Sequence, residues 1–322
     1  MNSPTSQFKT VVIAIGGNAL VPDNSGLATK IQFENSKIVA QYIADMVEEG
    51  WNVVLTHGNG PQVGALLRRC EMTKTELPGL PVDVAVGDTQ GEIGYMLQNV
   101  IGNELKKRGI QKSIVSVVTQ VVVDTQDPAF QNPDKPIGQF MSEAEAKQNA
   151  AEQNWTVKED SGRGWRRVVA SPKPQRIVED QAIQTLIKQG FLVIACGGGG
   201  VPVKEDAKQN LTGVEAVIDK DRASAILAAQ LKADLFLIPT GVEKIAINFG
   251  KPDQLWLEHL SIAEAQKHMS DGQFGAGSMG PKVESILDYL EVVPHGCGLV
   301  TNLESVRKAL RGETGTRISA KS

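Results

Sequence analysis

Three glycine-rich turns, each directly after a short run of apolar and β-branched residues, constrain the fold of this chain more than any other feature. They are Gly16-Gly17-Asn18 after residues 11–15, Gly58-Asn59-Gly60 after residues 53–55, and residues 197–200 after residues 191–195. A buried strand that runs into glycine and then a helix leaves backbone N–H groups at the carboxyl end of a sheet, where they bind anions such as phosphate. One such turn can be a plain tight turn, but three in one chain predict a site for a long, highly charged ligand.

Strand-like and helix-like segments alternate along nearly the whole chain. The expected helices cover residues 34–49, the stretch after Pro61, and residues 179–189, 221–231 and 281–290. Further expected strands cover residues 114–118, 235–238 and 245–247. In the first helix, Ile38, Ile43 and Met46 belong to one apolar stripe that Gly50 ends. The alternation predicts an α/β fold, with a mostly parallel open sheet covered by helices on both faces.

Residues 124–174 interrupt this alternation with many polar and turn-forming residues. Because a structureless loop of that length is unusual in a compact domain, we expect an inserted subdomain over residues 126–171. It should contain a helix near residues 142–152 and short strands around residues 156–158 and 166–169. Insertions of this kind often act as lids over a site.

Composition argues against nucleic acid as a partner. The net charge is −4, only 5% of residues are aromatic, and no lysine or arginine block is long enough to follow a phosphate backbone. We interpret the short basic cluster of Arg163, Arg166 and Arg167 as a solvated face.

The sequence also argues against a membrane or secreted protein. No apolar run approaches the ~20 residues that span a bilayer, and the first nine residues lack the apolar core of a signal peptide. Cys70, Cys196 and Cys297 are odd in number and form no C-x-x-C pair, which is typical of a reducing compartment. We therefore expect a cytoplasmic protein.

The chain lacks several common catalytic motifs: a P-loop, a complete dinucleotide fingerprint, zinc-ligand spacing and a G-x-S-x-G elbow. Glycine turns, lysines and an aspartate remain as candidates. Phosphoryl transfer needs little more, because its catalysis is mainly positioning and electrostatic stabilisation. Lys220 lies at the start of a predicted helix between Asp219 and Asp221, which would keep it charged and oriented. Lys282 lies in the first turn of another helix, whose dipole favours phosphate.

Each of these features also has a purely structural interpretation. A lysine near a helix end is usually solvated, and a single glycine turn is usually just a turn. We interpret His57, before the second turn, as structural. We interpret Cys196 as buried packing, because nothing in the sequence indicates a base that would make it a thiolate. Only the combination of features indicates phosphoryl transfer.

Six segments together resemble the carbamate kinases, a branch of the amino-acid kinase family. They are residues 11–20 (VVIAIGGNAL), 56–64 (THGNGPQVG), 196–203 (CGGGGVPV), 213–221 (GVEAVIDKD), 248–252 (NFGKP) and 277–282 (GSMGPK). The glycine turns alone indicate only the wider family. The combination of THGNGPQVG, GVEAVIDKD and the inserted PDKPIG of residues 133–138 is far more specific.

The resemblance covers nearly the whole chain and implies an open αβα sandwich. It implies a single domain over residues 1–322, with the carbamate and phosphoryl side in about residues 1–210. The nucleotide side would lie in about residues 211–322. It also implies a homodimer.

The resemblance further implies roles for individual residues. Lys220 would stabilise the transition state, Asp221 would orient the lysines, and Lys282 would contact the terminal phosphates of the nucleotide. Lys135, on the insertion, would swing over the site and bind carbamate or carbamoyl phosphate. The phosphoryl group and the carbamate end would be held by Gly16, Gly17, Asn18, Gly58, Asn59, Gly60, Gly197 and Gly198. The nucleotide would be bordered by Thr240, Gly241, Val242, Asn248, Phe249, Gly250, Lys251, Ser278, Met279 and Lys282.

One position departs from the wider family. Many of its kinases carry a lysine two residues before the first Gly-Gly, where this chain has Ala14. Carbamate kinases share this departure, so another lysine must supply the charge.

The expected activity is reversible phosphoryl transfer between ATP and carbamate, with Mg²⁺ accompanying the nucleotide and no dedicated metal ligands in the chain. The expected direction is ATP synthesis from carbamoyl phosphate during arginine, agmatine or allantoin breakdown. Carbamate is already an anion, so its attack needs no general base. Two alternatives remain: a kinase for another small acid, and a nucleotide-binding paralogue without turnover. Retention of Lys135, Lys220, Asp221 and Lys282 argues against the second alternative.

Overall fold

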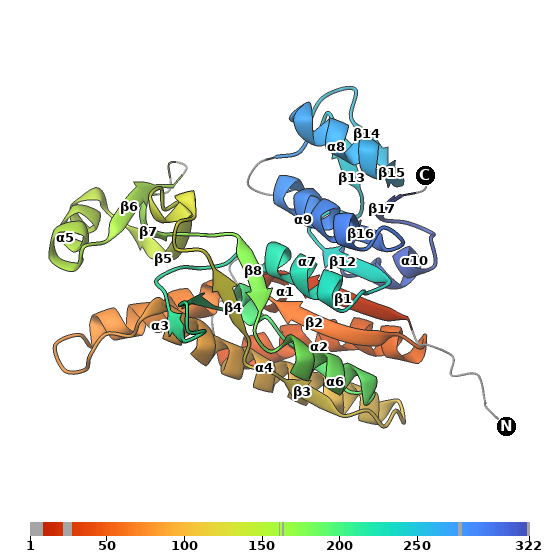
Figure 1. The fold of residues 1–322 in the computed structure, drawn as a ribbon, viewed down its shortest axis with the longest axis horizontal. Helices are drawn as coiled ribbons and strands as arrows, with labels where there is room; N and C mark the ends of the chain where they lie inside the picture. Colours follow the sequence, from red (N-terminus) through yellow and green to blue (C-terminus); the bar gives the residue numbers. More distant parts are fainter. Residues whose placement is uncertain (1–8, 22–27, 161, 163, 276–278, 321–322) are drawn as a thin grey trace.

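The structure is a computed structural model that describes residues 9–21, 28–160, 162, 164–275 and 279–320 (Figure 1). Eight of the described strands form the central sheet, in the order β15-β17-β16-β12-β1-β2-β9-β3. Their bounds are β1 (Thr10–Ile15), β2 (Asn52–His57), β3 (Ile114–Ser116), β9 (Leu192–Ile194), β12 (Leu235–Pro239), β15 (His259–Ser261), β16 (Cys297–Thr301) and β17 (Thr316–Ser319). The strands from β3 to β16 run parallel, and only β17 pairs antiparallel with its neighbour β16. The predicted mostly parallel sheet is confirmed, and the carboxyl ends of β12, β1, β2 and β9 meet at one edge.

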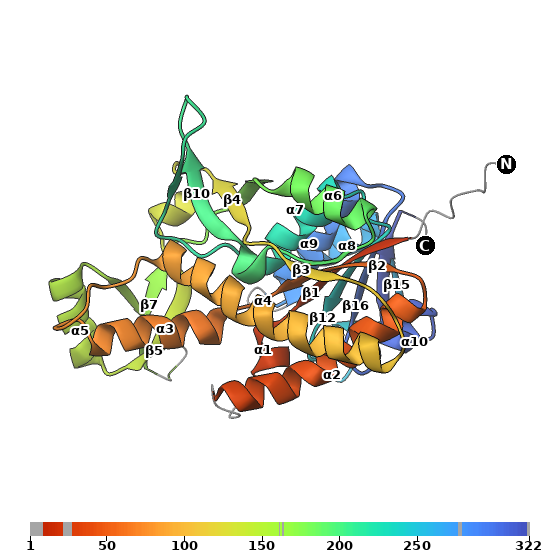
Figure 2. The same ribbon diagram turned by 90° about the horizontal axis from the view of Figure 1, so that it is seen from below.

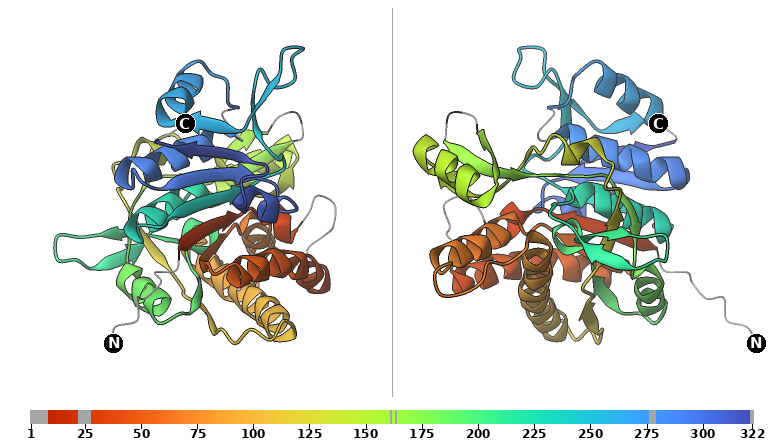
Figure 3. Two further views of the ribbon diagram at one scale, coloured as in Figure 1. Left: turned by 90° about the vertical axis from the view of Figure 1, so that its right-hand side faces the viewer. Right: turned by 60° about the vertical axis from the view of Figure 1, so that its left-hand side comes forward.

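Helices cover both faces of the central sheet (Figures 2 and 3). Alternate residues of the central strands face two separate hydrophobic layers. Val12 and Phe236 face one layer, which includes residues of α6, α7, α8 and α9. Val11 and Leu237 face the other, which includes residues of α2, α4 and α10. The helices are α2 (Thr29–Glu48), α4 (Val82–Lys107), α6 (Asp180–Lys188), α7 (Lys220–Gln230), α8 (Ile262–Ser270), α9 (Met279–Val292) and α10 (Val306–Leu310). Burial on both faces explains why these strands are continuous apolar runs.

The longest described helix, α4, was not predicted from the sequence. It contains Gly87, Gly91 and Gly94, and glycine is a poor helix former, so the local pattern is weak. Tertiary contact explains Gly94: a Cβ there would lie 2.1 Å from the Ser116 hydroxyl oxygen. Glycine therefore lets α4 approach β3 closely.

Several other boundaries differ from the prediction. Helix α2 begins at Thr29, five residues early, and Ile38 is 49% exposed while Ile43 and Met46 are buried. Helix α9 begins at Met279, two residues before the predicted start, so Pro281 is its third residue. Proline is still tolerated there, because the N–H groups of the first helical turn have no partner within the helix. The predicted strand over residues 245–247 is confirmed as β13 (Ile245–Ile247), but it is not part of the central sheet. It instead pairs with β14 (Leu255–Leu257) in a sheet of their own.

Strands β5 (Lys135–Met141), β6 (Thr156–Glu159) and β7 (Trp165–Val169) form a small antiparallel sheet that projects from the body together with α5 (Glu143–Gln153) (Figure 1). The Ser142 hydroxyl accepts a hydrogen bond from the Glu145 N–H and so caps α5. The expected helix and two strands are confirmed, whereas β5 was not expected. We call this unit, residues 135–169, the insert. The wider boundaries 126–171, the lid role and the division near residue 210 stay predictions.

The remaining elements connect these parts. They are α1 (Gly17–Leu20), α3 (Gly60–Met72), the 3₁₀ turns η1 (Pro128–Phe130) and η2 (Gly197–Gly199), and the sheet of β4 (Gln120–Val123), β8 (Pro174–Ile177), β10 (Val201–Glu205) and β11 (Leu211–Gly213). Within the described residues, no helix combines the length and apolar character that crossing a membrane requires.

Candidate active site

The first two glycine turns touch through their backbones at the carboxyl ends of β1 and β2. The Gly58 N–H donates to the Ile15 carbonyl at 2.9 Å. A Cβ on Gly58 would lie 2.8 Å from the Gly17 nitrogen, so only glycine fits there. The first two turns therefore lie side by side at this edge of the sheet, and their binding of an anion stays a prediction.

The third turn packs beneath the second. Residues 197–200 are all buried. Gly198 has φ +67°, and a Cβ on it would lie 2.1 Å from the Asn59 side-chain nitrogen. A Cβ on Gly199 would lie 2.4 Å from the Ile218 carbonyl oxygen, in the segment that leads to Lys220. Close packing is therefore the visible role of Gly197 and Gly198, and their contact with a phosphoryl group stays a prediction.

Gln90, which was not among the predicted site residues, holds this third turn in place. Its side-chain amide donates to the carbonyls of Gly197 at 3.0 Å and Thr119 at 3.2 Å, and its oxygen accepts from the Thr119 N–H at 2.7 Å. Gln90 lies on α4, the helix that the local pattern did not reveal, so no sequence signal was available for it.

The first two turns are more open. Gly16, Gly17 and Gly58 are half-buried, and Gly60 is exposed as the first residue of α3. The positive end of the α3 dipole therefore lies at this edge, where it favours an anion. Asn18 is the second residue of α1, next to Gly17.

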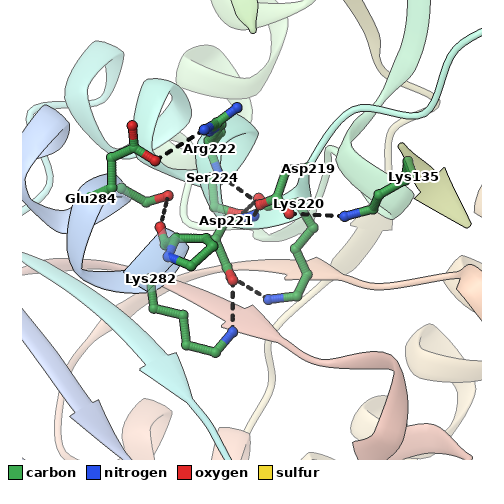
Figure 4. Close-up of polar contacts among 10 residues, drawn as sticks. Lys135, Asp219, Lys220, Asp221, Arg222, Ser224, Lys282 and Glu284 are labelled. Carbon is green, nitrogen blue, oxygen red and sulfur yellow. Dashed lines mark hydrogen bonds and ion pairs between the residues drawn. The ribbon is translucent and has the colours of Figure 1, made fainter. Parts of the chain in front are cut away.

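A single buried carboxylate holds two of the predicted lysines (Figure 4). Asp221 binds the Lys220 ammonium through one oxygen and the Lys282 ammonium, at 2.8 Å, through the other. The Lys220 ammonium also donates to the Ala14 carbonyl at 3.1 Å. Lys220 therefore brings its charge to the backbone of Ala14, the position where many kinases of the wider family carry a lysine.

Charge balance in this cluster keeps the Asp221 carboxylate ionised. Burial disfavours the charged form of Asp221, but Lys220 and Lys282 outweigh it and hold its pKa at about 2. Burial lowers the pKa of Lys220, and the neighbouring Asp221 carboxylate opposes that shift. The arrangement places two ammonium groups side by side, which suits a ligand with several negative charges.

The third lysine, Lys135, reaches the cluster from the insert (Figure 4). Its ammonium donates to one oxygen of Asp219 at 3.1 Å. The other Asp219 oxygen accepts from the backbone N–H groups of Asp221 and Arg222, which caps α7. Burial opposes ionisation of Asp219, but Lys135 and Lys220 together outweigh it, and the pKa of Asp219 is lowered.

The expected role of Asp219 is therefore corrected in part. Both flanking aspartates were expected to orient Lys220, and Asp219 does help to keep it charged. Its hydrogen bond, however, goes to Lys135. An aspartate directly before a helix is a capping signal, but the sequence contains no signal for its partner on the insert.

His57 and Cys196 have the structural surroundings expected of them. Burial lowers the pKa of His57 to about 4, so the ring is neutral near pH 7. A Cβ on Gly197 would lie 2.5 Å from the imidazole, so the ring packs against the third turn. Burial raises the pKa of the Cys196 thiol well above its usual range, as expected of a packing residue.

The predicted nucleotide residues fall into separate groups. Thr240, Gly241 and Val242 follow β12 at the same sheet edge as the glycine turns, and the Thr240 N–H donates to the Thr301 carbonyl at 2.7 Å. Met279 begins α9, the helix that carries Lys282. Ser278 lies outside the described residues.

The second nucleotide group lies in the hairpin of β13 and β14. Asn248 has φ +52° and donates to Asp253 at 2.8 Å. Phe249 is 65% exposed, and Gly250 and Lys251 are also exposed. Contact of either group with nucleotide stays a prediction.

The basic cluster is not the solvated face that we expected. Arg167 has a side chain only 18% exposed, lies over the Trp155 ring at 4.7 Å and pairs with Glu215 at 2.9 Å. Arg166 donates to the Gly138 carbonyl at 3.0 Å and lies over the Phe140 ring. Arg163 lies outside the described residues. The interpretation is therefore wrong for Arg166 and Arg167.

The donor set suits a metal that arrives with its nucleotide. In the described part of the chain, no group of three His, Cys, Asp or Glu side chains could hold a metal ion. Both Asp221 oxygens are occupied by lysines. Mg²⁺ usually keeps several waters and binds through substrate phosphates, which fits this arrangement.

Comparison with known proteins identifies the family. The model of the amino acid kinase family matches residues 9–294. The carbamate kinase of Thermococcus kodakarensis is 48% identical to this chain, over 97% of this chain and 99% of its own length. The carbamate kinase of Clostridium perfringens is 47% identical, over 96% of this chain and 99% of its own length. The solved structure of the Giardia lamblia carbamate kinase bound to AMP-PNP has a TM-score of 0.92 and 41% identity, covering 97% of this chain and 99% of its own. The chain belongs to the amino acid kinase family and, within it, to the carbamate kinases.

Proposed function

We propose that this protein catalyses reversible phosphoryl transfer between ATP and carbamate, the carbamate kinase reaction. The observation that carries the proposal is the pair of ammonium groups of Lys220 and Lys282 on one buried carboxylate. Lys220 also reaches the end of β1, directly before the first glycine turn. The near full-length similarity to carbamate kinases supports the same reaction.

The lysines and the turns would perform complementary parts of the reaction. The transferred phosphoryl group carries negative charge on its equatorial oxygens, so fixed positive charge lowers the barrier. Lys220 would stabilise that charge directly, and Lys282 would bind the terminal phosphates of the nucleotide. The first two turns and the α3 N-terminus would hold the phosphoryl group and the carbamate end. Asp221 acts through the two lysines and is a positioning residue.

No proton needs to move for the attack. Carbamate is an anion, and its oxygen attacks the γ-phosphorus without a general base. His57 is neutral, buried and packed against Gly197, as expected if it has no role in proton transfer. When bound, Mg²⁺ would neutralise phosphate charge, held mainly by the nucleotide and water.

Lys135 would bind the carbamoyl side from above. It is the first residue of β5, so its position depends on the insert. We propose that the insert acts as a lid over the substrate. The test is hydrogen exchange across residues 126–171 with and without carbamoyl phosphate. Equal exchange rates in the two conditions would contradict the lid role.

The cellular setting follows from the same proposal. The enzyme would make ATP from carbamoyl phosphate during arginine, agmatine or allantoin breakdown in the cytoplasm. It would act as a homodimer through the edge strand β3 and the neighbouring helices, because the packed pair α2 and α4 exposes Ile38 (49%) and Tyr95 (63%). A solution mass of twice 34.6 kDa by light scattering tests the dimer.

The test of the reaction is ATP formation from ADP, Mg²⁺ and one of three acyl phosphates. Carbamoyl phosphate should be the selective donor, with acetyl phosphate and N-acetylglutamyl phosphate as comparisons. Lys220→Ala serves as the blank, and Lys147→Ala, an exposed lysine on the insert, as the matched control. Activity only with another acyl phosphate would keep the fold and overturn the substrate. Nucleotide binding without turnover of any donor would indicate the non-catalytic alternative.

A further inference from the structure

The five residues before Lys220 carry two carboxylates that bind cations of the insert. Asp219 accepts from Lys135 on β5 at 3.1 Å, and Glu215 accepts from Arg167 on β7 at 2.9 Å. Both contacts therefore join the insert to residues 215–219, the segment that ends at Lys220.

Backbone hydrogen bonding runs between these two contacts. Ala170, directly after β7, forms a parallel bridge with Ala216, and the Val217 N–H donates to the Ala170 carbonyl at 2.9 Å. Lys135 lies opposite Val169 in the pairing of β5 with β7. The segment 215–219 thus lies beside the strand that leaves the insert, with an ion pair on either side of the bridge.

The rest of the insert is attached by different means. Ile137 and Val169 join a hydrophobic cluster with Val63 and Leu67 of α3 and residues of α4. A Cβ on Gly64 would lie 3.3 Å from the Gly138 Cα, so α3 and β5 are in close contact. These contacts fix the base of the insert, but none of them involves the Lys135 ammonium.

We propose that Asp219 and Glu215 are positioning residues that seat the insert against the Lys220 segment and thereby hold Lys135 over the substrate. Asp219 is well suited to this, because capping α7 fixes its carboxylate relative to Lys220. Glu215 anchors the adjacent strand through Arg167, whose guanidinium is also held over Trp155. The two carboxylates act together, because both attach the insert to the same five-residue segment. The kinetic part of this inference rests on the proposed function.

The structural test is hydrogen exchange of the unliganded enzyme, followed by mass spectrometry. Asp219→Asn keeps a good helix cap and removes the charge, and Glu215→Gln changes a side chain that is already 56% exposed. Each variant should raise exchange rates in residues 135–141 and 165–169 at least threefold, and the double variant should raise them further. Glu143→Gln removes an exposed ion pair inside the insert and is the matched control. Exchange rates that stay unchanged in both Asp219→Asn and Glu215→Gln would overturn the proposal, and so would an equal rise in Glu143→Gln.

The kinetic test separates positioning from general destabilisation. Asp219→Asn should raise the KM for carbamoyl phosphate about tenfold while kcat changes less than threefold. In a Lys135→Ala background the same substitution should change KM less than twofold, because the group it positions is absent. An equal effect in both backgrounds would overturn the proposal.

The two tests distinguish failure of the proposed positioning role of Asp219 and Glu215 from failure of the proposed function. The exchange experiment uses no substrate, so its result is decisive even if the enzyme is inactive with carbamoyl phosphate. If wild-type protein makes no ATP from carbamoyl phosphate, the proposed function is wrong. The exchange experiment alone then decides whether Asp219 and Glu215 hold the insert in place.

Discussion

The glycine turns and the lysine cluster lie at the same sheet edge, yet they are held in place by different forces. The turns are fixed by backbone contact, as where Gly58 meets Gly17 with no room for a Cβ. The ammonium groups come from three distant elements and are fixed by two aspartates, Asp219 and Asp221. Steric contact between adjacent turns does not depend on charge, whereas an ammonium stays in place only while its carboxylate does. We therefore expect the two regions to respond to different substitutions.

The largest effect should come from removing the shared carboxylate. Asp221→Asn leaves Lys220 and Lys282 close together without their counter-ion. Breaking a buried ion pair costs about 3–5 kcal/mol of unfolding free energy. Activity should fall by about 10²–10³, the usual effect of losing a preorganised charge contact. Urea unfolding and steady-state kinetics measure both. A variant with wild-type stability would show that the lysines do not depend on Asp221.

The pH dependence of stability should come from the turn region. The pKa of His57 is 6.5 when unfolded and about 4 when folded, so the unfolded chain binds more protons between these values. Stability should therefore rise from pH 4 to 6.5 and be lost on acidification, by about 3 kcal/mol from this residue. The Asp221 contribution is present above pH 3.8 and is lost as pH falls towards 2, outside that window.

The check on this assignment is His57→Gln, with unfolding free energies measured at pH 6.5 and 4. Whatever its stability at pH 6.5, the variant should lose less on acidification than the wild type does. Parallel losses in the two proteins would exclude His57 as the source.

A smaller effect should separate two glycines of the turn region. Gly58→Ala forces a Cβ to within 2.8 Å of the Gly17 nitrogen, which is backbone and cannot rotate away. Overpacking of this kind costs about 1–3 kcal/mol. Gly16→Ala is the matched control, because a Cβ there meets nothing within 4 Å. Thermal denaturation compares the two variants. Equal melting temperatures would mean that the turns are not sterically locked.

The sequence predicted the turn region better than the charged one, for a physical reason. Each turn follows its own strand, so local apolar runs and glycines were sufficient to locate β1, β2 and β9 along the sequence, whereas their order in the sheet comes from the structure. Helix α4 was not predicted because its glycines weaken the local helix pattern. At least Gly94 is explained by a tertiary contact, its close approach to Ser116. The pairs of Lys135 with Asp219 and Arg167 with Glu215 span 84 and 48 residues, and local patterns carry no information at that range. Lys135 itself was found only through the resemblance.

The most direct test of the account is a double-mutant cycle on kcat for ATP formation, with Lys220→Ala and Lys282→Ala. If the two ammonium groups share one carboxylate and act on one transferred group, each single variant should lose about 10²–10³. The double variant should then lose no more than about tenfold beyond the worse single variant, because residues that act as a unit are not additive. Losses that multiply in the double variant would show two independent contributions and contradict a single centre organised by Asp221.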